Sequence, residues 1–151
     1  TTIIKHKFMN ITKYVLVLLV MPFLFGCNSD DYQYTDKYLP NYNFSIDIDM
    51  SLPLYAPLQF TANPVYIDQA GIGINGIIVM NTGGGYVAYE ASCPNQNLDS
   101  CSKLAVDGIM AICPCDEAEY NLFNGQAEGK EYPLKPYRIQ VTSGTSIRVY
   151  N

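Results

Sequence analysis

The sequence is poor in histidine and contains no tryptophan. Its single histidine, His6, lies in an N-terminal segment that we expect to be removed on export, so the mature chain would contain no imidazole. A Ser-His-Asp triad, a Cys-His pair, a zinc site with histidine ligands and histidine-ligated haem all require that side chain. Much enzyme chemistry is therefore excluded, and we identify no catalytic residue.

Basic residues are also scarce. The chain has 9 Lys and Arg against 14 Asp and Glu, and Lys5, Lys7 and Lys13 all precede Cys27. Six basic and 14 acidic residues then remain in the mature part, a net charge of −8. This balance argues against nucleic acid as a partner and against binding to anionic lipid through a basic patch.

The longest apolar run is short and lies near the N-terminus. Residues 14–25 are almost all apolar, follow Lys13 and lead to Gly26-Cys27, which is typical of the apolar part of an export signal. About twelve apolar residues interrupted by Pro22 are too few for a transmembrane helix, which needs about 20. The pattern therefore favours a secreted or anchored protein over a membrane-spanning one.

Leu24-Phe25-Gly26-Cys27 resembles the lipobox of bacterial lipoproteins. The resemblance implies a signal peptide over residues 1–26, cleavage before Cys27 and acylation of that cysteine, with about 0.8 kcal/mol of membrane binding per buried CH₂. We then expect a flexible tether over residues 27–42 and one domain over residues 43–151. The protein would be anchored in the cell envelope, at the periplasmic or surface face of the outer membrane. The alternative is an ordinary secretory signal that contains a cysteine.

The mature part shows strand patterns and no helical period. Residues 44–50, FSIDIDM, alternate apolar and polar side chains, which indicates a strand with one buried face. The glycine-rich residues 81–85 and residues 142–145 are typical of hairpin loops. We therefore predict an all-β fold, a small antiparallel sandwich or barrel. The other predicted strands are residues 65–68, 76–80, 86–90, 109–112, 118–123, 137–141 and 146–150.

Residues 71–76, GIGING, match the letters of the dinucleotide-binding fingerprint. That fingerprint requires a strand before it and a helix after it, whereas this stretch leads into a predicted strand. We therefore discount nucleotide binding.

Four further cysteines follow Cys27. An even number in an exported domain indicates disulfides, and four cysteines allow three pairings. A thiol–disulfide enzyme is disfavoured, because Cys-Pro-Cys is not the Cys-x-x-Cys of such enzymes and no helix follows to lower a thiol pKa. The four residues are Cys93, Cys101, Cys113 and Cys115.

Two short segments resemble the motif of Rieske [2Fe–2S] domains, Cys-x-His followed after 15 to 17 residues by Cys-x-x-His. They are Cys93-Pro94-Asn95 and, 17 residues later, Cys113-Pro114-Cys115-Asp116. Asn95 and Asp116 stand where the histidines belong. The resemblance covers roughly residues 60–150 and implies a Rieske-like β fold.

In that family two cysteines bind one iron, two histidines bind the other, and many members have a disulfide between the two cluster loops. By position, Cys93 and Cys113 would bind iron, and Cys101 and Cys115 would form the loop disulfide. Asn95 and Asp116 are poor replacements for imidazoles at the second iron. Without a cluster, the two ligand sulfurs would lie within about 4 Å of each other. We therefore expect a second disulfide, Cys93–Cys113.

Two functions remain open. The first is a membrane-anchored, non-enzymatic module stabilised by disulfides and without a cofactor. The alternative is an electron-transfer protein that binds a [2Fe–2S] cluster through Cys93, Cys113, Asn95 and Asp116 and serves an oxidoreductase. The expected partners are the membrane, through the lipid anchor, and an envelope or redox protein.

Overall fold

The computed structural model describes Tyr34 and residues 36–151 of the 151-residue chain. The predicted signal peptide, Cys27 and the first part of the tether lie outside the described residues. Within the described part, no helix is long and apolar enough to cross a membrane. Residues 34–151 form one compact unit.

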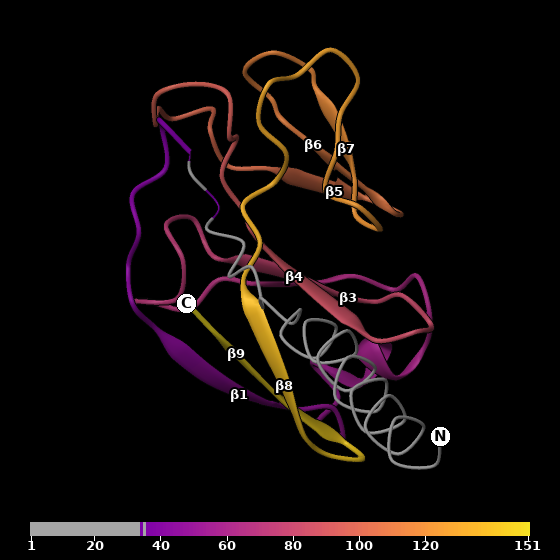
Figure 1. The fold of residues 1–151 in the computed structure, drawn as a ribbon. Helices are drawn as coiled ribbons and strands as arrows, with labels where there is room; N and C mark the ends of the chain where they lie inside the picture. Colours follow the sequence, from indigo (N-terminus) through magenta and orange to yellow (C-terminus); the bar gives the residue numbers. More distant parts are fainter. Residues whose placement is uncertain (1–33, 35) are drawn as a thin grey trace, which may run out of the picture. The chain divides into compact units, whose positions relative to one another are not determined.

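The described residues form three antiparallel sheets of three strands each (Figure 1). The first has the order β1-β9-β8, from Ser45–Asp49, Ser146–Tyr150 and Arg138–Ser143. The second has the order β2-β3-β4, from Val65–Ile67, Ile77–Asn81 and Tyr86–Glu90. The third has the order β5-β6-β7, from Ala105–Asp107, Met110–Ile112 and Glu119–Asn121. The predicted all-β class is confirmed.

The predicted alternation and hairpins are also confirmed. In β1, Ile46 and Ile48 are buried while the residues between them are exposed, and Ile48 pairs with Ile147 of β9. The β3–β4 hairpin is closed by a hydrogen bond from Thr82 N to Gly85 O of 2.8 Å. Gly144 and Thr145, within the second predicted loop, connect β8 to β9.

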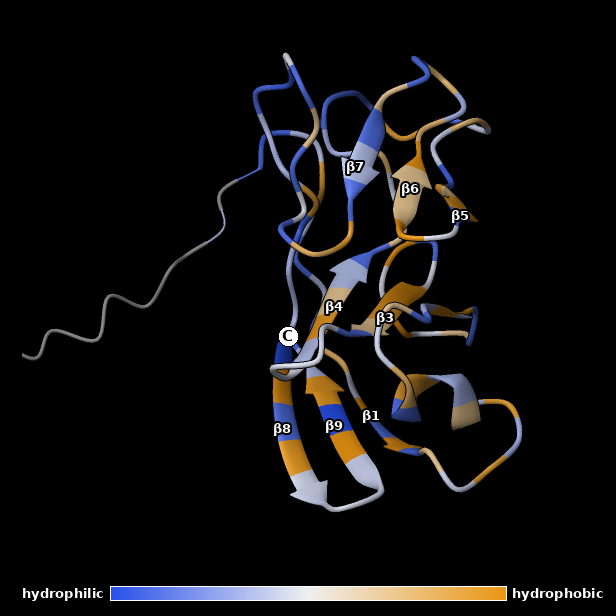
Figure 2. Cartoon of the chain, turned by 90° about the vertical axis from the view of Figure 1, so that its right-hand side faces the viewer, coloured by the Kyte–Doolittle hydropathy of each residue, from blue (hydrophilic) through white to orange (hydrophobic). Residues whose placement is uncertain are grey.

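Strand β3 separates two hydrophobic clusters. Ile77 and Val79 pack into a cluster with β1 and β9, whereas Ile78 and Met80 pack into a second cluster beneath the cysteine loops. All four side chains are fully buried, as expected for a strand covered on both faces. Figure 2 shows the β1-β9-β8 sheet at one end of this unit and the β5-β6-β7 sheet at the other. The cysteine loops therefore rest on a core of their own.

The structure differs from the sequence predictions at two short elements. Strand β5 was not predicted, because its residues alternate too briefly to stand out and only Val106 is partly buried. Gly108, with φ of +55°, forms the tight turn that pairs β5 with β6. A short 3-10 helix, η2 (Ala56–Gln59), buries Leu58.

The last residues of the predicted tether lie against the domain. Leu39 is 4% exposed, the Tyr34 hydroxyl donates to Pro133 O at 2.7 Å, and the Tyr38 ring packs edge-on against Tyr132. Single apolar or aromatic side chains spaced irregularly leave no periodic signal. These side chains therefore belong to the compact unit that begins at Tyr34.

Candidate functional site

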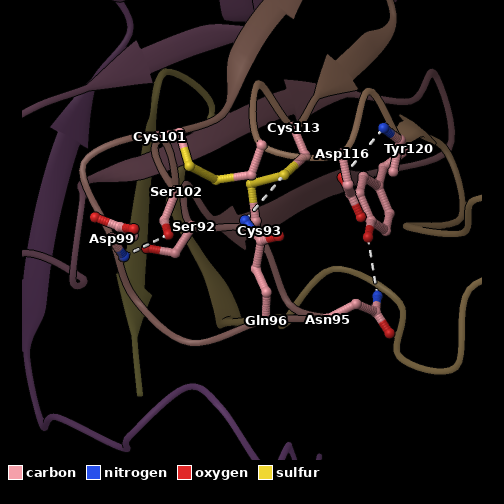
Figure 3. Close-up of a disulfide and its surroundings, with 12 residues drawn as sticks. Ser92, Cys93, Asn95, Gln96, Asp99, Cys101, Ser102, Cys113, Asp116 and Tyr120 are labelled. Atoms are coloured by element: carbon pink, nitrogen blue, oxygen red, sulfur yellow. Dashed lines mark hydrogen bonds between the residues drawn. A yellow bond between two sulfur atoms is a disulfide. The ribbon is translucent and has the colours of Figure 1, made fainter.

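Two loops carry the four cysteines (Figure 3). The first follows β4 and is closed by a hydrogen bond from Cys93 N to Ser102 O of 2.8 Å. The second joins β6 to β7 and is closed by a hydrogen bond from Cys113 N to Ala118 O of 2.9 Å. Glu117 completes this turn with a positive φ of +56°. Both loops are thus fixed by backbone contacts as well as by sulfur.

The structure pairs the cysteines as Cys93–Cys113 and Cys101–Cys115, with Cα atoms 5.6 and 5.1 Å apart. These are the two pairs expected from the sequence when no cluster is bound. The first, which we call the inner disulfide, is 1% and 0% exposed at its two residues. The second, the outer disulfide, is only partly buried. Each cross-link joins one loop to the other.

Three of the four sulfur atoms form a tight group. The Sγ atoms of Cys93, Cys113 and Cys115 all lie within 4.8 Å of one another. The Gln96 side chain donates a hydrogen bond from Nε2 to Cys113 Sγ at 3.5 Å. The two disulfides are therefore close neighbours inside one cluster of sulfur atoms.

Asn95 is bonded to the main chain and to a buried tyrosine. Its Nδ2 donates to Tyr132 O at 2.7 Å and to the Tyr120 hydroxyl at 2.9 Å. Its Oδ1 accepts from Tyr132 N at 2.9 Å. Burial raises the pKa of the Tyr120 hydroxyl, while the hydrogen bond with Asn95 opposes that rise. Asn95 therefore fastens the first cysteine loop to β7 and to the segment around Tyr132.

Asp116 also forms an ion pair and a hydrogen bond. Its Oδ2 lies 2.6 Å from Lys130 Nζ, and both side chains are 27% exposed. Its Oδ1 accepts from Ala118 N at 3.2 Å, which stabilises the turn after Cys115. The carboxylate thus holds a loop and an ammonium group.

The residues at the family's ligand positions do not fit a Rieske cluster. The Asn95 amide uses its oxygen and its nitrogen elsewhere, Asp116 is paired with a cation, and the two cysteine sulfurs are bonded to each other. A neutral amide is moreover a weak ligand for iron. We derive no electron-transfer step through this site.

A buried polar network that the sequence did not predict is centred on Glu90, which is fully buried. Its Oε1 accepts from Asn75 N at 3.0 Å and Ser92 Oγ at 2.8 Å. Its Oε2 accepts from Ile74 N at 2.7 Å and the Tyr137 hydroxyl at 2.6 Å. Burial and the neighbouring Glu90 carboxylate strongly raise the pKa of Tyr137. The carboxylate is therefore satisfied by four donors.

The glycine-rich stretch that resembled a nucleotide motif forms the cradle of this carboxylate. A Cβ at Gly73 would lie 2.8 Å from Glu90 Oε2 and 2.6 Å from Gly76 O. The signal in the sequence that could have indicated this network was Glu90 itself, a charged residue at the end of a predicted strand. Lys135 lies nearby, 2% exposed, and donates from Nζ to Pro40 O at 2.6 Å. Burial lowers its pKa.

A shallow pocket of about 550 Å³ lies beside the second cysteine loop. Four carboxylates and one ammonium group line it, together with Met110, Ala118, Gln126 and Ala127. The charged residues are Asp116, Glu117, Glu119, Glu128 and Lys130. The charge of this hollow suits a cationic group better than an anion.

No protein-family model matches the chain, and no curated protein sequence matches it. Among solved structures, it is similar to a chain of the complex of reduced oxygenase and oxidised ferredoxin in carbazole 1,9a-dioxygenase. The identity is 18%, over 70% of this chain and 92% of that chain, with a TM-score of 0.47. The ferredoxin of carbazole 1,9a-dioxygenase from Nocardioides aromaticivorans IC177 is 17% identical, over 72% and 97% of the two chains, with a TM-score of 0.42.

A putative NADH-dependent nitrite reductase small subunit from Mycobacterium tuberculosis is also similar. It is 15% identical over 74% of this chain and 97% of that chain, with a TM-score of 0.43. With identities of 15–18% and TM-scores below 0.5, these similarities assign no ligand and no role to this chain. The three antiparallel sheets by themselves show that the fold of the described residues is all-β.

Proposed function

We propose that this chain is a lipid-anchored envelope protein whose domain is a non-enzymatic module with a Rieske-like fold, stabilised by two disulfides. The domain would bind or support an envelope partner rather than carry electrons. The alternative, a [2Fe–2S] electron carrier, requires ligands at the positions of Asn95 and Asp116.

The observation that best supports this proposal is that the Asn95 amide already uses both its oxygen and its nitrogen in hydrogen bonds. Its three hydrogen bonds engage both ends of the amide, with Tyr120 and with the N–H and C=O of Tyr132. Turning the amide toward a metal would leave these partly buried groups unpaired, at about 1–3 kcal/mol for each group deprived of water. These contacts are better explained if Asn95 holds the first cysteine loop in place than if it binds a metal.

The anchor is supported by the sequence alone. The lipobox-like Leu24-Phe25-Gly26-Cys27 ends only seven residues before Tyr34, where the compact unit begins. Seven extended residues span at most about 25 Å. An acylated Cys27 would therefore hold the domain close to the membrane surface.

The test of the module is made on the full chain, produced in a bacterium and purified from its envelope without reductant. Iron content and visible spectrum are recorded, and the cysteine pairs are mapped by non-reducing peptide mass analysis. We expect no iron and both disulfides, Cys93–Cys113 and Cys101–Cys115. Two irons per chain with sulfur-to-iron absorption bands, lost in Asp116→Ala, would establish the electron carrier instead.

The test of the anchor compares the native chain with Cys27→Ser. We expect the native chain in the membrane fraction, with a peptide mass at Cys27 that shows acyl groups. Cys27→Ser should lack acyl groups and retain the signal peptide. A native chain released as a soluble protein with an unmodified N-terminus would overturn the anchor and leave the module untouched.

A further inference from the structure

We propose that reduction of the two disulfides creates a zinc site, in which Cys93, Cys113 and Cys115 bind the metal as thiolates and Cys101 supplies the fourth ligand. This inference goes beyond the proposed function, which concerns the oxidised protein. It also differs from the ligand set implied by the Rieske resemblance, because it uses no residue at the histidine positions.

The sulfur positions suit a tetrahedral ion. Zinc binds thiolates at about 2.3 Å, which places the sulfurs of a tetrahedral site about 3.8 Å apart. Three Sγ atoms already lie within 4.8 Å of one another, so the unbonded pairs are within about 1 Å of that spacing. The bonded Cys93 and Cys113 sulfurs would move apart to that spacing once their bond is reduced. The Cys101 sulfur lies next to this group, since it is bonded to that of Cys115.

Contacts that do not involve sulfur keep the loops in place. Cys93 N bonds to Ser102 O across the first loop, and Cys113 N bonds to Ala118 O across the second. The hydrogen bond from Asn95 to Tyr120 connects the first loop to β7, next to the second loop. Reduction therefore opens the S–S bonds but leaves the fold of each loop and the Asn95–Tyr120 contact in place.

The surroundings favour thiolates bound to a soft ion. Cys93 and Cys113 are buried in an apolar cluster, which excludes competing water. The Gln96 amide donates to Cys113 Sγ, and such outer hydrogen bonds orient and stabilise metal ligands. Asp116, the carboxylate that follows Cys115 in the sequence, is held by Lys130. An all-sulfur donor set selects zinc over magnesium or calcium.

The chemistry balances as follows. Each disulfide takes two electrons and two protons from one molecule of a dithiol, which becomes a cyclic disulfide. Two dithiols thus convert the two disulfides into four thiols. When zinc binds, the four thiols release up to four protons to solvent, and four Zn–S bonds form.

The experiment uses the full chain, reduced under anaerobic conditions and freed of reductant. Cobalt(II) serves as a spectroscopic probe, and zinc(II) is then added to displace it. We expect one cobalt per chain with the visible bands of tetrahedral thiolate coordination, complete displacement by one equivalent of zinc, and no binding to the oxidised chain. Native mass spectrometry counts the bound metal.

Three variants assign the ligands. Cys115→Ser should weaken cobalt binding by more than the roughly 10–100-fold that follows loss of an outer partner. Cys101→Ser should also weaken it and change the bands, because one sulfur is replaced. Asp116→Asn is the matched control and should bind cobalt as the parent chain does.

A reduced, folded chain without thiolate bands would overturn the proposal, as would equal binding by Cys115→Ser. If reduction unfolds the chain, zinc must restore the native circular dichroism spectrum, and failure to do so counts against the site. These results leave the disulfide module standing, since its own test is the iron content of the chain isolated without reductant.

Discussion

Removing the two disulfides separately should have unequal effects on stability. The chain-entropy relation predicts about 3.3 kcal/mol for the inner disulfide Cys93–Cys113 and about 3.0 kcal/mol for the outer disulfide Cys101–Cys115, from sequence separations of 20 and 14 residues. The inner cysteines are also 1% and 0% exposed, so replacement by alanine leaves space in the core at about 1 kcal/mol per lost group. Replacing the inner pair should therefore lower the free energy of unfolding by about 5 kcal/mol, and replacing the outer pair should lower it by about 3 kcal/mol.

The assay is urea unfolding of the full chain, of Cys93→Ala/Cys113→Ala and of Cys101→Ala/Cys115→Ala, without reductant and followed by tyrosine fluorescence. The free energy of unfolding is obtained for each variant with its own fitted slope, because removal of a cross-link changes the unfolded state and with it the slope. An outer-pair variant that loses as much as the inner-pair variant would refute the reasoning from burial. A loss below about 1 kcal/mol in both variants would refute the reasoning from loop length.

Three further outcomes follow from the described contacts. Asn95→Ala should lower the free energy of unfolding by about 2–3 kcal/mol, since it removes three hydrogen bonds of about 1 kcal/mol each; a loss below 0.5 kcal/mol in urea unfolding would contradict the clamp. The pKa of Tyr137 is raised in the folded chain. Its contribution to the free energy of unfolding is therefore intact at pH values below the pKa of about 10 that the residue has in the unfolded chain, and it is lost as the pH rises above that pKa. Unfolding measured against pH should then show a weaker alkaline decline in Tyr137→Phe, and identical profiles would contradict this. At Gly73, φ is +67° and an added Cβ would lie 2.6 and 2.8 Å from its neighbours, whereas at Gly129 φ is +68° and the space is open. Gly73→Ala should therefore lower the free energy of unfolding more than Gly129→Ala. The latter should lose only the conformational cost of about 1–2 kcal/mol, and equal thermal midpoints would show that the cradle tolerates a methyl group.

The strands could be predicted because their signals are local. Alternation in residues 44–50 reflects a strand with one buried face, and glycine in residues 81–85 reflects backbone angles that a hairpin loop requires. The same reasoning missed β5, whose three residues expose two side chains. It also placed residues 36–42 in a tether, because their contacts with the domain come from scattered side chains such as Leu39.

The role of the candidate site residues was harder to predict. The resemblance to the Rieske motif implied that Cys93, Asn95, Cys113 and Asp116 belong to one site, but it could not show the partners of these side chains. Asn95 bonds to Tyr132, which is 37 residues away, and Asp116 to Lys130, which is 14 residues away. Such pairs depend on how loops fold onto each other, and neither an asparagine nor an aspartate indicates in the sequence which residue it will bond to. The Glu90 network escaped prediction for the same reason.

The chemistry of asparagine explains why this residue suits its position when no cluster is bound. A side-chain amide has the donor and the acceptor of a peptide on one flat group, so it can bond to the N–H and the C=O of Tyr132 together, as Asn95 does. A neutral imidazole has one donor and one acceptor on different nitrogens of its ring, so it cannot pair with both groups in this way. In a Rieske cluster the metal itself would connect the two loops. In this structure two disulfides connect the cysteine loops. The Asn95 amide fastens the first loop to Tyr120 and Tyr132, through atoms that a metal ligand would need to keep free.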